Sequence, residues 1–107
     1  MALQETPELD GGLKTYIATM GEEAYKLGFS LAMALRGQGI SAEMDFEGKS
    51  LKAQMRAADR LGAKYVAIIG DDELKNHTIT LRNMGTKEQS MIPERNFISE
   101  MERLFVK

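Results

Sequence analysis

The sequence predicts an α/β domain, in which a mixed five-stranded sheet is flanked by three helices in the order βαβαβ-ββα. Three observations lead to this prediction. Short β-prone segments alternate with helical segments over the first 70 residues, which is typical of parallel strands joined by right-handed crossovers. The alternation then stops, and two β-prone segments follow each other around Gly85, as in an antiparallel hairpin. A final amphipathic segment predicts a closing helix.

The first half of the chain predicts two strands separated by a helix. Residues 15–20 (TYIATM) form a β-prone run before a glycine. Residues 22–38 carry apolar side chains at the spacing of one helical stripe. That stripe includes Gly28, which costs some helicity and permits close packing on a sheet. Apolar and polar residues alternate over 40–44, which predicts a half-buried second strand.

The middle of the chain predicts a second helix and a central strand. Ser50 has the side chain of a good N-cap. We expect the following helix to bury one apolar face, made of Leu51, Met55, Ala58 and Leu61. The continuous apolar run YVAII, residues 65–69, suits a strand that is covered on both faces.

The last third predicts a turn, a hairpin and a helix. Three consecutive acids, residues 71–73, indicate an acidic turn after the central strand. Residues 78–83 alternate between apolar and polar, and pair in this prediction with a short strand over 89–92. Pro93 is suited to the start of a helix, whose apolar face is made of Phe97, Met101, Leu104 and Phe105.

Composition and charge exclude several classes of protein. With 107 residues the chain is long enough for one modest core, and the absence of cysteine excludes disulfides and thiolate metal sites and fits a reducing cytoplasm. A formal net charge of −2 argues against a general nucleic-acid coating protein, but permits a local basic patch. No apolar run is long enough to cross a membrane. Residues 1–12 lack an apolar period and predict a flexible linker or leader before a domain at 13–107.

Three segments contain charged residues of the types that bind ligands or catalyse reactions. Glu22 and Glu23, after the first strand, complement a helix dipole and would repel a phosphate, which disfavours a small nucleotide-binding enzyme. Lys52, Arg56 and Arg60 share one helical stripe, which is either a solvated face or a row of phosphate contacts. The acids at 71–73 lack the ligand spacing of a calcium loop, and a single histidine makes a zinc site improbable. The residues therefore indicate neither a metal site nor catalysis.

Three stretches of the chain form a further pattern: TMGEEA, LRGQGISAEMDFEGKSLKAQMRAADRLGAKYVAIIGDDEL and ITLRNMGTKEQSMIP, of which the run 49–72 is the most specific. With these stretches in this order, the chain resembles the C-terminal anticodon-binding domain of histidyl-tRNA synthetase, of the bacterial type, over residues 13–105. Related domains occur in threonyl-, prolyl- and glycyl-tRNA synthetases. The resemblance implies the same fold as the patterns do, a class II synthetase anticodon-binding domain.

The resemblance also implies RNA-binding positions. Glu73 in GDDEL and Arg82 in ITLRNM match places where related synthetases contact anticodon bases. The helix that tracks the anticodon loop is matched by Gln54, Lys49, Lys52 and Arg56. Glu47 and Gly48 stand where a relative carries Arg-Asn, so base contacts from that loop are not implied here. His77 matches no functional position.

The function implied is recognition of the anticodon, GUG, of histidine tRNA. The resemblance further implies a parent enzyme that is a homodimeric, cytoplasmic ligase, whose catalytic domain activates histidine with ATP and Mg²⁺ and then charges the tRNA. The signature segments of that catalytic domain have no match in this chain, which is therefore expected to be non-catalytic alone and to carry no cofactor. The alternative is a synthetase-like domain reused for regulation or protein interaction without RNA reading.

Overall fold

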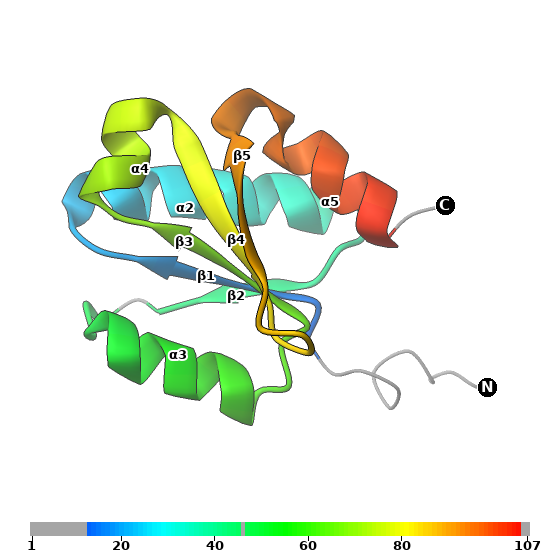
Figure 1. Ribbon diagram of the computed structural model, residues 1–107, viewed down its shortest axis with the longest axis horizontal. Coiled ribbons are helices and arrows are strands. Elements are labelled where there is room, and N and C mark those ends of the chain that lie inside the picture. The colour runs from blue at the N-terminus through cyan, green and yellow to red at the C-terminus, as the bar shows by residue number, and fades with distance from the viewer. Residues whose placement is uncertain (1–12, 46, 106–107) are drawn as a thin grey trace.

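The computed structural model describes residues 13–45 and 47–105, and it confirms the predicted fold class (Figure 1). The linker predicted for residues 1–12 lies outside the described residues. The elements are β1 (Thr15–Thr19), α2 (Glu22–Gly37), β2 (Ala42–Met44), α3 (Leu51–Arg60), β3 (Tyr65–Ile69), α4 (Asp71–Asn76), β4 (Thr78–Asn83), β5 (Gln89–Pro93), the 3-10 helix η1 (Glu94–Asn96) and α5 (Phe97–Phe105). No helix among the described residues is long and apolar enough to span a membrane.

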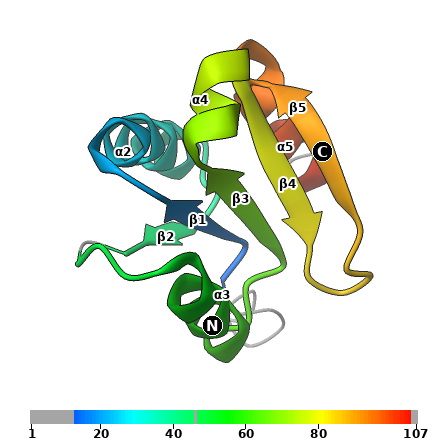
Figure 2. The same cartoon turned by 60° about the vertical axis from the view of Figure 1, so that its left-hand side comes forward.

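The sheet is mixed, with the strand order β2-β1-β3-β4-β5. β1 pairs in parallel with β2 and with β3, whereas β4 runs antiparallel to both β3 and β5. Helices α2 and α5 lie on one face, and α3 lies on the other (Figures 1 and 2). The predicted parallel half and the predicted hairpin are therefore both present.

Each face of the sheet buries its own core. The larger core lies under α2 and α5, and its fully buried members include Ile17, Leu35, Ile69, Ile79, Phe97 and Met101. The smaller core lies under α3 and contains Tyr16, Ala18, Ala58, Ala63 and Val66. The second core reaches only β1 and β3, because α3 is short and lies beneath those two strands.

Gly28, in the middle of α2, allows the close helix–sheet contact that the sequence predicts. A Cβ atom on Gly28 would lie 2.7 Å from Thr19 Cγ2 and 3.0 Å from Ile17 Cγ2, both on β1. These distances are shorter than the contacts that packed side chains tolerate. Gly28 therefore sets how closely α2 approaches the sheet.

Two local predictions were wrong. The acidic segment after β3 is a short helix, α4, and its three acids occupy the first turn, where negative charge is favourable. Leu61, predicted on the buried face of α3, is 47% exposed, because α3 ends at Arg60 and Leu61 is its C-cap. The position that α3 buries instead is Gln54.

Candidate nucleic-acid interface

The sheet face that carries α3 is only partly covered by that helix. Side chains that share this face form rows across the sheet, one running from Val66 on β3 through Arg82 to Gln89. The next row runs through Thr80 to Met91. Met91 is 58% exposed. We call the four side chains on β4 and β5 the open face: Thr80, Arg82, Gln89 and Met91. Polar and apolar groups are thus presented together on rigid strands.

Arg82 is anchored on this face by its neighbour on β5. Its Nη1 donates a hydrogen bond to Gln89 Oε1 at 3.0 Å, across a register pair of the hairpin. Its Nε is buried and has no hydrogen-bond partner among the described residues. A guanidinium has five N–H donors, so most of them stay available to a ligand while the strand fixes the stem of the side chain.

Glu73 reaches the same face from α4. Its Oε1 accepts from the Gly70 N–H at 2.8 Å, and its Oε2 accepts from Thr80 Oγ1 at 2.7 Å. Partial burial opposes ionisation of Glu73, but these two hydrogen bonds prevail and hold its pKa below the ordinary value. Because Thr80 and Arg82 are two residues apart on one strand, they point to the same side of the sheet, so Glu73 bonds to the face that carries Arg82.

A basic groove borders the open face. It has a volume of about 350 Å³, and its lining residues are Lys52, Met55, Arg56, Asp59, Arg82, Met84 and Lys87. In both views the turn between β4 and β5 reaches down to the level of α3 (Figures 1 and 2). The predicted stripe of Lys52 and Arg56 therefore lies beside the predicted Arg82, with four cations and one carboxylate along one groove.

Gln54, one of the RNA-binding positions that the resemblance implies, is buried within the protein. It is 1% exposed, and its amide is already bound on both sides. Its Oε1 accepts from the Thr19 N–H at 3.0 Å, while its Nε2 donates to Thr19 O at 2.9 Å and to Lys49 O at 2.8 Å. The side chain thus ties the β2–α3 loop to β1, so we assign it a positioning role.

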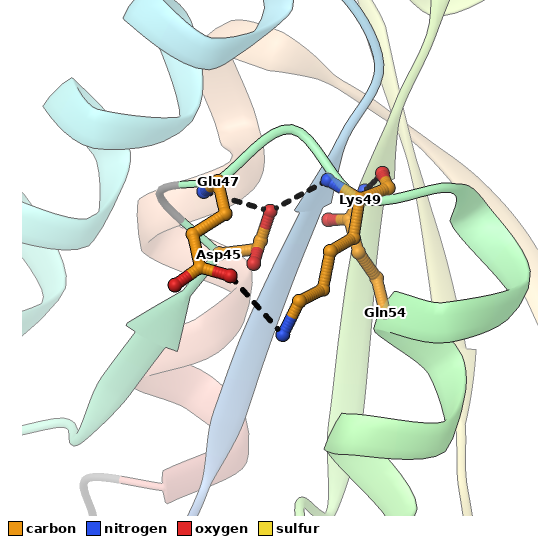
Figure 3. Close-up of polar contacts among 4 residues, drawn as sticks. All are labelled: Asp45, Glu47, Lys49 and Gln54. Atoms are coloured by element: carbon orange, nitrogen blue, oxygen red, sulfur yellow. Dashed lines mark hydrogen bonds and ion pairs between the residues drawn. The ribbon is translucent and has the colours of Figure 1, made fainter.

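Lys49 lies in that loop and does not line the groove (Figure 3). Its backbone N–H and that of Glu47 both donate to Asp45 Oδ2, at 2.9 and 3.1 Å. Its ammonium group lies 3.5 Å from Glu47 Oε1, and both side chains are largely exposed. An exposed pair of this kind contributes little stability, so Lys49 can exchange its partner for another anion at small cost.

His77 ends helix α4. It is the C-cap of α4, with a left-handed backbone (φ 56°), and its carbonyl oxygen accepts from the Glu94 N–H at 2.9 Å. In the part of the chain that the structure describes, no group of three His, Cys, Asp or Glu side chains is placed to hold a metal ion.

Sequence reasoning missed Thr80, Gln89, Met91 and Lys87 as members of this surface. The alternation along β4 does indicate that Thr80 and Arg82 share a face. The partners on β5 depend on the register of the hairpin, which shifts by one residue with the length of its turn and moves every side chain to the other face. The groove also required the position of α3 relative to the turn, which no local pattern carries.

Comparisons with known proteins show the family to which this chain is similar. A family model described as "Anticodon binding domain" matches residues 14–104. The histidine–tRNA ligase of Anoxybacillus flavithermus is 44% identical over 93 residues, which cover 87% of this chain and 22% of that protein. The ligase of Bacillus subtilis is 42% identical over 93 residues, with the same coverage. The chain spans about a fifth of the length of these curated relatives.

Solved structures show the same relationship. The structure of apo Staphylococcus aureus histidyl-tRNA synthetase matches with a TM-score of 0.80 at 38% identity, covering 85% of this chain and 27% of that one. A prolyl-tRNA synthetase from Cryptosporidium parvum matches with a TM-score of 0.77 at 14% identity, over 87% of this chain and 20% of that one. The second match shows a shared fold alone.

Proposed function

This chain belongs to the anticodon-binding domain family of the histidyl-tRNA synthetases, and we propose that it recognises the anticodon, GUG, of histidine tRNA. The observation that carries the proposal is the surface around the open face: Arg82 lines a groove together with Lys52, Arg56 and Lys87, and Glu73 bonds to Thr80, two residues before Arg82 on β4. Base-reading groups and phosphate-binding groups are thus combined on one surface, as sequence-specific binding of single-stranded RNA requires.

The chemistry of the two central residues suits an unstacked base. Arg82 can pair through two N–H groups with the O6 and N7 of a guanine, or stack on its ring. The carboxylate of Glu73 can accept from a base amino group, and its lowered pKa keeps it ionised at neutral pH. Lys52 and Arg56, and Lys49 from the neighbouring loop, supply positive charge for the phosphates.

The remaining parts of the proposal concern the whole protein. We infer that this domain acts beside a catalytic domain that activates histidine with ATP and Mg²⁺ and charges the tRNA, in a homodimeric enzyme of the cytoplasm. The domain itself supplies no catalytic residue in this scheme. Its contribution is selectivity, because a correct base contact stabilises the complex by about 1–3 kcal/mol relative to a wrong base.

The test is a titration of this chain against a fluorescently labelled anticodon stem-loop of histidine tRNA, followed by anisotropy at two salt concentrations. We expect salt-sensitive binding that prefers GUG over a scrambled anticodon. Arg82→Ala should weaken binding by about 10- to 100-fold and reduce that preference. Arg82→Lys should keep the charge and lose the bidentate geometry, so that it retains salt sensitivity while losing much of the preference.

Arg103→Ala is the matched control, because Arg103 lies on α5, across the sheet from the groove, where it pairs with Glu100. It removes the same charge and should leave RNA binding unchanged. Binding by the wild type that shows no salt dependence, or no preference for GUG, would overturn the proposal.

A further inference from the structure

Lys87, in the turn between β4 and β5, has an unfavourable backbone conformation. Its φ is +71°, in the left-handed region where glycine or asparagine is preferred. Among the described residues, His77 is the other non-glycine residue with positive φ, and it caps a helix. A lysine at such a position costs stability, and residues kept in this conformation often serve function.

The turn itself does not need the lysine side chain. Asn83 Oδ1 accepts from the N–H groups of Gly85 and Thr86, at 2.8 and 3.0 Å. The backbone N–H of Lys87 donates to Asn83 O at 2.7 Å, and Thr86 Oγ1 accepts from the Glu88 N–H at 3.2 Å. A glycine would make the same backbone bond. The fold therefore gives no reason for an amine at this position.

The side chain instead lines the basic groove. Lys52 and Arg56 contribute to one wall from α3, and Lys87 contributes to the other from the hairpin turn. The ion pairs found within residues 13–45 and 47–105 involve none of these three cations. Their charge is not neutralised by a direct carboxylate contact in the described part of the chain, so an anionic ligand can use it.

We propose that Lys87 is a phosphate-binding residue that closes on the sugar-phosphate backbone of the bound RNA from the hairpin side, opposite Lys52 and Arg56. The inference rests on the proposed function, because it takes the ligand to be an RNA strand. It adds a second wall to the phosphate site, which the stripe on α3 alone does not provide. The cost of the left-handed lysine is then explained by a side chain that a glycine could not supply.

The test is Lys87→Gly in the full chain, measured for both stability and binding. The glycine removes the backbone strain, so the Tm should rise by about 2–6 °C. It also removes one phosphate contact, so binding of the anticodon stem-loop should weaken by about 3- to 10-fold at low salt. The slope of log K against log salt should become shallower by about 0.7. The preference for GUG should not change, because phosphate contacts carry no sequence information.

Two further variants serve as controls. Lys87→Arg keeps the positive charge and should keep the wild-type salt slope. Lys26→Ala removes one exposed charge from α2, on the opposite face of the sheet, and should leave the slope unchanged.

The outcomes separate this inference from the proposed function. A wild type without salt-sensitive binding would overturn both. A wild type that binds as expected, with an unchanged salt slope for Lys87→Gly, would overturn the role of Lys87 and leave the anticodon-binding proposal standing. A Tm below that of the wild type would show that the lysine is retained for stability, and would also overturn the inference.

Discussion

Replacing Gln54 with leucine should destabilise the domain by about 3 kcal/mol, although the two side chains are similar in size. The reason lies at the end of β1. The Thr15 N–H donates to Ser41 O on the β2 side. The backbone N–H and C=O of Thr19, four residues further along the strand, point to the same side. β2 has already ended there at Met44, so the amide of Gln54 takes the place of a strand partner for both the N–H and the C=O of Thr19.

The magnitude follows from those two backbone groups. Thr19 is 8% exposed and Gln54 is 1% exposed, so water cannot readily replace the lost amide. A buried backbone group without a partner costs about 1–3 kcal/mol, and Gln54→Leu leaves two of them. The third hydrogen bond, to Lys49 O, is partly exposed and can be replaced by water. A loss of about 3 kcal/mol is a large share of the stability of a domain this size, and it should lower the Tm by about 12–24 °C.

The assay is urea unfolding followed by circular dichroism, with Gln38→Leu as the control. Gln38 is an exposed C-cap residue of α2, so its replacement should change stability by less than about 0.5 kcal/mol. Gln54→Glu adds a pH signature, because the introduced carboxylate would face two carbonyl oxygens. Its folded pKa should be raised, so the penalty is full at neutral pH and is relieved as the pH falls below that value. A loss of under 1 kcal/mol for Gln54→Leu would refute the reasoning.

Three further substitutions test other parts of the structure. Thr80→Val removes the hydroxyl that donates to Glu73 and should cost about 1.5 kcal/mol at pH 7. Because the folded pKa of Glu73 is lowered, the stability that it contributes is present above the unfolded pKa and is lost as the pH falls through the folded one. Unfolding at pH 7 and pH 3 should therefore show the gap between variant and wild type closing at the acidic value, and an equal gap at both would contradict this role. Gly28→Ala should lower the Tm, although alanine favours helices by about 1 kcal/mol, because its Cβ would meet β1 at 2.7 Å; a higher Tm would show that the contact relaxes freely. Ser50→Ala removes the oxygen that accepts from the Ala53 N–H and should cost about 1 kcal/mol in urea unfolding, where no change would exclude a cap.

The sequence was informative wherever periodicity and burial agree. The run at 65–69 is uniformly apolar because β3 is central and covered on both faces, and the alternation at 78–83 follows from a strand with one buried side. Gly28 could be interpreted as a packing glycine because it interrupts an otherwise apolar helical stripe. These features depend on near neighbours in the chain, which a sequence displays directly.

The parts that could not be predicted depend on distant contacts or on very short elements. α4 has six residues, too few to show a helical period, although acids in a first turn are a helix signal. Gln54 looks like a surface residue by type, and its burial depends on Thr19, 35 residues away. The resemblance supplied Arg82 and Glu73 as candidates, and the bond from Thr80 that ties Glu73 to the strand of Arg82 emerged only from the fold. The place of Lys87 in the groove required the position of α3 relative to the hairpin turn.

The end of β1 also bears on how molecules of this domain behave toward one another. A strand edge with unpaired N–H and C=O groups recruits strands from other molecules and starts aggregation. β2 covers β1 only from Thr15 to Ile17, and so leaves the last part of β1 at the margin of the sheet. The amide of Gln54 occupies the donor and the acceptor of Thr19 that an incoming strand would need. One side chain therefore shields this margin from edge-to-edge pairing. The strand β2 can stop after three residues without leaving the end of β1 open to an incoming strand.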